Sequence, residues 1–138
     1  MEDMKINLSA LVVKIKLSAL WVAAMFCYLY ADVLVLLVPG ILEELVAGEV
    51  GGMQITQAFL YASALIMVPP IVMIFLSLTL SYPVNRWANI ILGIVYTGII
   101  LGMLLMDPSV PYLVYGSVEV VLTALIVWYA WKWSKPEI

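Results

Sequence analysis

Two carboxylate side chains, Asp32 and Glu119, lie in stretches that are otherwise apolar, YLYADVLVLLVPG and YGSVEVVLTAL. Neither stretch contains a Lys, Arg or His residue. A charged carboxylate near the centre of a bilayer costs a few kcal/mol even on lenient insertion scales. We therefore predict one of three states for the pair: both groups protonated, one proton shared between them, or a cation held between them.

This pair has more than one interpretation. Protonated carboxyl groups can donate hydrogen bonds to a backbone carbonyl or a tyrosine and so fix the packing of helices. An ionisable side chain inside a membrane also predicts, by default, a functional proton or cation site. If a span boundary lies elsewhere, one of the two carboxylates would instead lie among the lipid headgroups.

The composition of the chain indicates a membrane protein. Of the 138 residues, 66% are hydrophobic and 11% are charged, whereas a soluble domain is about 45–50% apolar and about 25% charged. The length predicts one domain that covers residues 1–138. The single cysteine, Cys27, excludes an intrachain disulfide.

Four apolar segments are long enough to cross a bilayer, whose core of about 30 Å needs about 20 helical residues. In lipid the backbone must satisfy its own hydrogen bonds, so each span is predicted to be a helix. The predicted fold is all-α, a four-transmembrane-helix bundle. The spans are 17–38, 54–80, 86–106 and 112–131, with a short interfacial helix at 41–47.

Basic residues predict the orientation of the bundle. All Lys and Arg residues fall before the first span, between the second and third, or after the fourth, and the other two loops hold only acidic charges. Positive charge marks the cytoplasmic side. We therefore predict a multi-pass protein of the plasma membrane with both termini cytoplasmic. The five tryptophans lie near that side and predict an interfacial belt. The residues Asn85, Arg86, Trp87 and Asn89 are predicted to cap the third span and to anchor it at the lipid headgroups.

The two carboxylates are predicted to lie at matching depth in the outer half of the membrane. Asp32 is six residues from the end of the first span, and Glu119 is seven residues from the start of the fourth, or about 9–10 Å for each. Each has a tyrosine one helical turn earlier, and the second span adds polar side chains near that level. The predicted proton, cation or substrate site comprises Asp32, Glu119, Tyr28, Tyr115, Gln57 and Tyr61.

Two backbone features stand out in the middle spans. Pro69 and Pro70 remove two backbone donors, which predicts either a kink or a break with free carbonyls that coordinate an ion or substrate. Gly98 and Gly102 form a G-x-x-x-G motif, which predicts close helix packing, within the chain or between two chains.

Several kinds of chemistry have no sequence signal. The chain has no glycine-rich phosphate loop, no paired cysteines, no histidine and no G-x-S-x-G motif. We predict no enzymatic activity, no cofactor and no metal site. The sparse basic residues argue against nucleic acid, which leaves the lipid bilayer as the predicted partner.

The stretches LSALWVAAMFCYLYADVLVL, GGMQITQ and NRWANI resemble a family of small prokaryotic four-span membrane proteins of unknown function. The resemblance covers the chain from Lys14 onward and implies four helices and a membrane location. It treats residues 1–13 as an addition. A more distant similarity is to small multidrug transporters, which also carry an acidic residue in the first span. The one-sided Lys and Arg distribution argues against the dual topology known in that group.

Three functions remain open from the sequence. In the first, Asp32 and Glu119 bind a proton or small cation in a transporter, which with four helices would work as a parallel homo-oligomer. In the second, the protein is a non-catalytic membrane scaffold or assembly subunit in which the carboxyls only fix helix packing. A third class, a lipid- or quinone-binding redox partner, rests on the tyrosines of the outer half.

Overall fold

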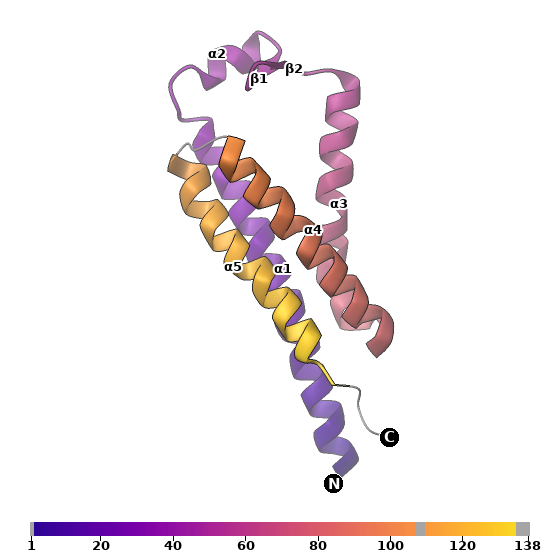
Figure 1. The fold of residues 1–138 in the computed structure, drawn as a ribbon. Helices are drawn as coiled ribbons and strands as arrows, with labels where there is room; N and C mark the ends of the chain where they lie inside the picture. The colour runs from indigo at the N-terminus through magenta and orange to yellow at the C-terminus, as the bar shows by residue number, and fades with distance from the viewer. Residues whose placement is uncertain (1, 107–109, 135–138) are drawn as a thin grey trace.

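The protein is a bundle of four long helices that are each apolar enough to cross a membrane. A computed structural model describes residues 2–106 and 110–134, with backbone alone for residues 2–7. The long helices are α1 (Glu2–Val35), α3 (Gln57–Thr79), α4 (Tyr82–Met106) and α5 (Val110–Lys132) (Figure 1). The predicted all-α membrane fold is therefore confirmed. Below, the end of the bundle beside the loop from α1 to α3 is called the loop end, and the opposite end, where α1 begins and α5 ends, the terminal end.

Helix α1 differs from the predicted first span at both ends. It begins at Glu2 instead of residue 17, because no Gly or Pro interrupts the chain before Pro39. Its 34 residues correspond to about 51 Å, more than the bilayer core requires. It therefore continues past the other helices at the terminal end (Figure 1). It ends at Val35, three residues early, because Pro39 disfavours helical backbone at the residue before it.

A small folded segment joins α1 to α3 at the loop end. Helix α2 (Ile41–Val46) is followed by strands β1 (Glu49–Val50) and β2 (Met53–Gln54), which pair antiparallel. Gly51 and Gly52 form the turn with φ values of +55° and +75°, as a tight hairpin turn with two left-handed residues requires. The hairpin takes up the first residue of the predicted second span, and α3 begins at Gln57.

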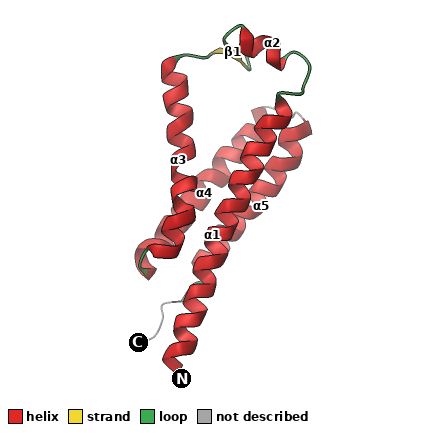
Figure 2. Cartoon of the chain, turned by 180° about the vertical axis from the view of Figure 1, so that it is seen from behind, coloured by secondary structure: helices red, strands yellow, loops and turns green. Residues whose placement is uncertain are grey.

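Helix α3 is the least closely packed of the four long helices. Helix α5 packs against both α1 and α4, and α3 packs mainly on α1. Near the terminal end α3 approaches α4, whereas toward the loop end it stands apart from the other helices (Figures 1 and 2). The hairpin segment spans this separation at the loop end.

The closely packed core lies in the half of the bundle nearer the terminal end. Four of its side chains are fully or almost fully buried: Leu17 and Trp21 from α1, Met73 from α3 and Ile126 from α5. The rings of Trp21 and Tyr96 meet edge to face with centroids 6.0 Å apart. This layer closes the centre of the bundle on that side.

A buried hydrogen-bond network crosses the same layer, and we call Trp21, Ser77, Asn85 and Asn89 the Asn89 network. Trp21 Nε1 donates to Asn89 Oδ1 at 2.8 Å, and Ser77 Oγ donates to the same oxygen at 3.3 Å. Asn89 Nδ2 donates to Asn85 Oδ1 at 2.7 Å, and Asn85 Nδ2 to the Ser77 carbonyl at 2.7 Å. The prediction that both asparagines cap the third span was therefore wrong, because they are fully buried and join helices.

The predicted tryptophan belt holds for some of the five tryptophans. Trp87, Trp128 and Trp131 are exposed on the outside of the bundle near the terminal end. Trp21 belongs to the core, and Trp133 is 6% exposed and packs edge to face on Tyr82. The belt prediction was wrong for these two because each makes contacts within the bundle.

Gly98 and Gly102, which form the G-x-x-x-G motif, make no close packing contact within the described chain. A Cβ added at either position would meet nothing within 4 Å. Two other glycines allow close approach. At Gly93 an added Cβ would lie 2.7 Å from Val127 Cγ2 and 3.3 Å from the Thr123 carbonyl oxygen, and at Gly116 it would lie 2.7 Å from Leu104 Cδ2. The alternative of packing within the chain was therefore wrong for the motif, and packing between two chains stays a prediction. Gly93 and Gly116 allow the close approach of α4 and α5.

Substituting these glycines should give effects of opposite sign. Gly93→Ala should destabilise the protein by about 1–3 kcal/mol because α4 and α5 must separate to admit the methyl group. Gly98→Ala should be neutral or stabilising by about 0.5–1 kcal/mol because Ala is the better helix former. Thermal unfolding of both purified variants in one detergent measures the difference. Equal stability of the two would contradict the packing role of Gly93.

Candidate functional site: a cavity between the four helices

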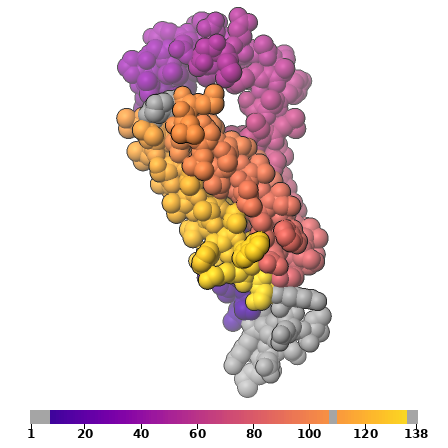
Figure 3. Space-filling view, viewed as in Figure 1, coloured from indigo at the N-terminus to yellow at the C-terminus, as the bar shows by residue number. Residues whose placement is uncertain are grey.

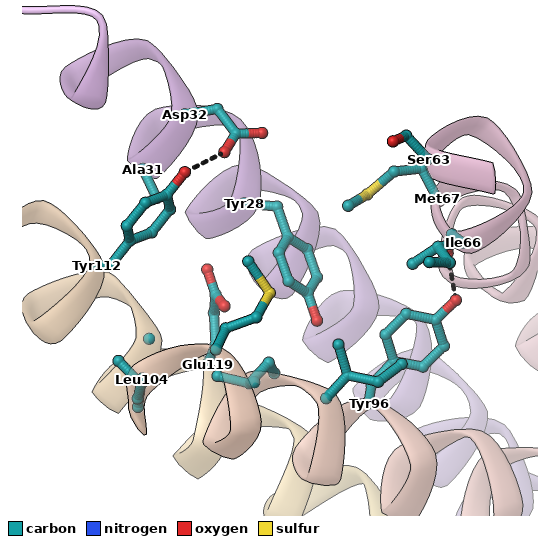
Figure 4. Close-up of a pocket in the computed structure, with 14 residues that line it drawn as sticks. Tyr28, Ala31, Asp32, Ser63, Ile66, Met67, Tyr96, Leu104, Tyr112 and Glu119 are labelled. Carbon is teal, nitrogen blue, oxygen red and sulfur yellow. Dashed lines mark hydrogen bonds between the residues drawn. The ribbon is translucent and has the colours of Figure 1, made fainter. Parts of the chain in front are cut away.

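A cavity of about 210 Å³ lies between the four long helices in the half of the bundle nearer the loop end (Figure 4). Its walls are mainly aliphatic, methionine and tyrosine side chains, and both carboxylates of the predicted pair line it. The lining residues are Tyr28, Ala31, Asp32, Ser63, Ile66, Met67, Tyr96, Ile99, Ile100, Met103, Leu104, Tyr112, Gly116 and Glu119.

Glu119 is the buried acid of the cavity. Its side chain is held between helices, so the residue is 4% exposed. It lies nine residues after the start of α5, or about 13 Å along the helix. Among the described residues, no side chain or backbone group makes a hydrogen bond to its carboxylate. A buried ionisable group with this environment can accept a proton or a cation without first breaking an internal contact.

Asp32 lies nearer the loop end and is exposed. It is three residues from the end of α1, or about 4.5 Å along the helix. The Tyr112 hydroxyl donates a hydrogen bond of 3.3 Å to Asp32 Oδ1, which joins α1 to α5. The prediction that both acids lie equally far from the loop-end termini of their helices was therefore wrong, because α1 ends three residues and α5 begins two residues earlier in the chain than expected. The two carboxylates are staggered along the bundle, and both line the cavity.

The described cations lie at the far end of the bundle from this cavity. Lys14 Nζ donates to the Leu78 carbonyl, and Arg86 donates to the carbonyls of Ala130 and Trp131. The remaining described cations, Lys16 and Lys132, lie over the rings of Tyr129 and Trp128. Within the described part of the chain, neither carboxylate has a basic partner. The charge of the buried Glu119 carboxylate must therefore be balanced by a proton or by a ligand.

Tyr28 adds an unsatisfied polar group to the cavity. Its ring extends from α1 into the space between Glu119 and Tyr96 (Figure 4). The hydroxyl oxygen is buried and makes no hydrogen bond to any residue that the structure describes. Buried hydroxyl groups usually have a partner. The free hydroxyl and the free carboxylate therefore leave room for a ligand with polar character.

At the two prolines of α3, a hydrogen bond joins α3 to α4. The chain stays helical through Pro69 and Pro70, so the predicted helix break was wrong. Pro70 has no N–H to bond the Ile66 carbonyl one turn earlier. The Tyr96 hydroxyl of α4 donates to that carbonyl instead (Figure 4), which satisfies the acceptor and joins α3 to α4 across the cavity.

Tyr96→Phe should loosen α3 from α4. The change removes the hydroxyl that satisfies the Ile66 carbonyl, so we expect a loss of about 1–2 kcal/mol in unfolding free energy. Tyr61→Phe is the matched control, because Tyr61 is 69% exposed and should change stability by less than about 0.5 kcal/mol. Thermal unfolding in detergent measures both. Equal unfolding temperatures for the two variants would show that this hydrogen bond does not stabilise the contact between α3 and α4.

Half of the predicted site lies elsewhere. Asp32, Glu119 and Tyr28 meet at the cavity, whereas Tyr115, Gln57 and Tyr61 do not line it. On α5 the lining positions are 112, 116 and 119, which share one helix face at spacings of four and three residues. The prediction of Tyr115 selected a side chain that lies beside this face and does not line the cavity. A count of this spacing from Glu119 could have found Tyr112 and Gly116.

The fold and the cavity define an integral membrane protein of four spans with an acidic site between its helices. Residues 4–138 match the model of the Family of unknown function (DUF6326), and the chain belongs to this family. The match begins before Lys14, so the lead-in that the resemblance set apart is part of the family pattern. No curated protein and no solved structure matches the chain. The similarity to small multidrug transporters is not shown by these comparisons.

Proposed function

We propose that this membrane protein is a proton- or cation-coupled transporter in which Glu119 and Asp32 bind the coupling ion. The observation that supports this most directly is the environment of Glu119. It is 4% exposed, it faces a cavity, and it has neither a hydrogen-bond donor nor a basic partner among the described residues. Such a group can bind a proton or cation without losing an existing contact.

The two carboxylates would have different roles. Asp32, exposed at the loop end, would exchange protons with water, and Glu119 would hold the ion deeper in the bundle. The alternative, a non-catalytic scaffold or assembly subunit, is favoured by one contact. The Tyr112 hydroxyl bonds Asp32 Oδ1 and joins two helices, as a packing role requires. Glu119 has no such bond within the described chain, which favours transport.

The shape of the bundle supports a site with access from one side. The cavity lies in the half nearer the loop end, while the core around Trp21 and the Asn89 network closes the other half. Transport would require a second arrangement in which that layer opens. Helix α3 is the element most suited to move, because it has few contacts with α4.

The remaining features of the proposal concern location and assembly. The described basic side chains lie toward the terminal end, which supports cytoplasmic termini and a plasma-membrane location. The cavity would then open toward the outer side. Four helices enclose little space, so we propose a parallel homo-oligomer. The protein would be non-enzymatic, in line with a sequence that holds no phosphate loop, no paired cysteines and no G-x-S-x-G motif.

Proton flux across liposomes tests the proposal. Purified protein is reconstituted, a pH-sensitive dye is enclosed, and a gradient of Na⁺, K⁺ or an organic cation is imposed. The transport proposal predicts a dye response that Asp32→Asn reduces and Glu49→Gln, at an exposed hairpin position, leaves unchanged. Flux equal to that of protein-free liposomes with every cation would favour the scaffold.

A further inference from the structure

The side chains of the cavity walls indicate which class of ligand would fit beside the two acids. Beside Glu119 the walls are formed by apolar side chains such as Ile66, Ile99 and Leu104, and by the methionines Met67 and Met103. Methionine is flexible and polarisable, and it adapts to ligands of different shape. Tyrosine rings can in addition contact a cation through their faces. These walls suit an apolar ligand that carries one positive charge.

An inorganic cation fits these walls less well. A desolvated metal cation takes several oxygen ligands. No group of three or more acidic, Cys or His side chains that could hold a metal occurs in the described residues. An organic ammonium group, by contrast, needs one carboxylate and apolar surroundings for its substituents. The balance of one buried carboxylate against many apolar side chains favours the organic cation.

The cavity also has an opening between helices. Ser63, Ile66 and Met67 of α3 form one wall, and α3 has few contacts with α4. In the space-filling view an opening is visible between α3 and the loop-end part of α4, below the hairpin segment (Figure 3). In a bilayer, an opening in the side of a bundle faces lipid. A ligand that partitions into lipid can therefore enter without crossing the hairpin segment at the loop end.

We propose that the cavity binds a small lipophilic organic cation, of the class of protonated or quaternary aromatic amines, which enters from the membrane between α3 and α4. Its positive charge lies at Glu119 beside the Tyr28 ring, and its apolar part lies against Met67 and Met103. The cavity of about 210 Å³ is smaller than the usual range for drug-sized ligands, about 300–1,000 Å³, so the ligand is small. This inference rests on the proposed function and names the substrate class of the same site.

Binding of a charged and an uncharged probe of the same shape tests this inference. The full chain in nanodiscs is titrated with radiolabelled benzyltrimethylammonium, and neopentylbenzene, its uncharged carbon analogue, is the competitor. We expect saturable binding of the cation, weakened about tenfold or more by Glu119→Gln, and no competition by the uncharged analogue. Glu43→Gln, in exposed α2, should bind as the wild type does. Equal competition by the analogue would overturn the inference in favour of a neutral apolar ligand such as a lipid tail.

A second variant covers the case in which Glu119→Gln does not fold. Met67→Trp keeps both carboxylates but fills the cavity, so it should abolish binding of benzyltrimethylammonium while the protein remains monodisperse. Unchanged binding would show that the cation binds elsewhere and would overturn the inference. Proton flux with Na⁺ or K⁺ but no binding of the organic cation would overturn the ligand class and leave transport standing. Binding of the organic cation without any proton flux would overturn transport and leave the ligand class standing.

Discussion

Glu119→Gln is expected to reduce cation-driven proton flux to the level of empty liposomes while the protein still folds. The amide has nearly the shape of the carboxyl group but cannot bind or release a proton in the physiological range. Because no hydrogen bond to the carboxylate exists among the described residues, the substitution breaks no internal contact, and we expect a stability change below about 1 kcal/mol. A carboxyl group that served packing would show the opposite pattern, lost stability with activity retained.

The measurement compares wild-type protein, Glu119→Gln and Glu49→Gln in the same liposome preparation. Glu49 is exposed in the hairpin segment and is removed from the cavity, so its substitution controls for the loss of one acidic charge. Equal reconstitution of the three proteins is checked by gel and by thermal unfolding. Undiminished flux in Glu119→Gln would remove Glu119 from the transport proposal.

Asn89→Leu is expected to cause the largest loss of stability in the chain. Leu has a similar size but no polar group, so Trp21 Nε1 and Asn85 Oδ1 would lose their partner in a fully buried layer. A buried polar group left without a partner costs about 1–3 kcal/mol, and hydrogen bonds inside membrane proteins fall toward the lower part of that range. We expect a loss of roughly 2–4 kcal/mol in unfolding free energy.

Denaturant unfolding, followed by tryptophan fluorescence in a single detergent, measures this loss. Gln57→Leu is the control, because Gln57 is exposed at the start of α3 and the same kind of polar-to-apolar change there should have little effect. A loss of less than about 1 kcal/mol for Asn89→Leu would show that the Asn89 network does not hold the terminal half of the bundle together.

The four helices could be predicted from the sequence because lipid imposes a simple rule of length and apolarity. Each span had to be helical and about 20 residues long. That rule says nothing of where a helix continues outside the bilayer, so the long extension of α1 to Glu2 was missed. The end of α1 before Pro39 was predicted to within three residues, whereas the hairpin turn at Gly51 and Gly52 was not predicted.

The candidate site could be predicted in part. Asp32 and Glu119 stand out because charge is rare in an apolar run. The faces that point inward are harder to find, because in a membrane both the inner and the outer face of a helix are apolar and the usual amphipathic signal is weak. For this reason Tyr115 was chosen from its place one turn before Glu119 and Tyr61 from its level in the second span, whereas Tyr112 lines the cavity.

Contacts between helices lay beyond the sequence altogether. Trp21 is a residue type common at membrane interfaces, and only the hydrogen bond from α1 to α4 places it with Asn85 and Asn89 in one buried network. The Tyr96 hydroxyl likewise satisfies an acceptor that the sequence shows to be free, the carbonyl before Pro70. Its donor could not be known before the position of α4.

Infrared difference spectroscopy of the purified protein tests the central claim most directly, because it detects the C=O stretch of a protonated carboxyl group inside the protein. Spectra are recorded across the physiological pH range and again after addition of benzyltrimethylammonium. We expect a carboxylic-acid band that is lost on raising the pH or on adding the cation, and that is absent from Glu119→Gln. A wild-type spectrum in which no carboxyl band changes with pH or with the cation would contradict the account.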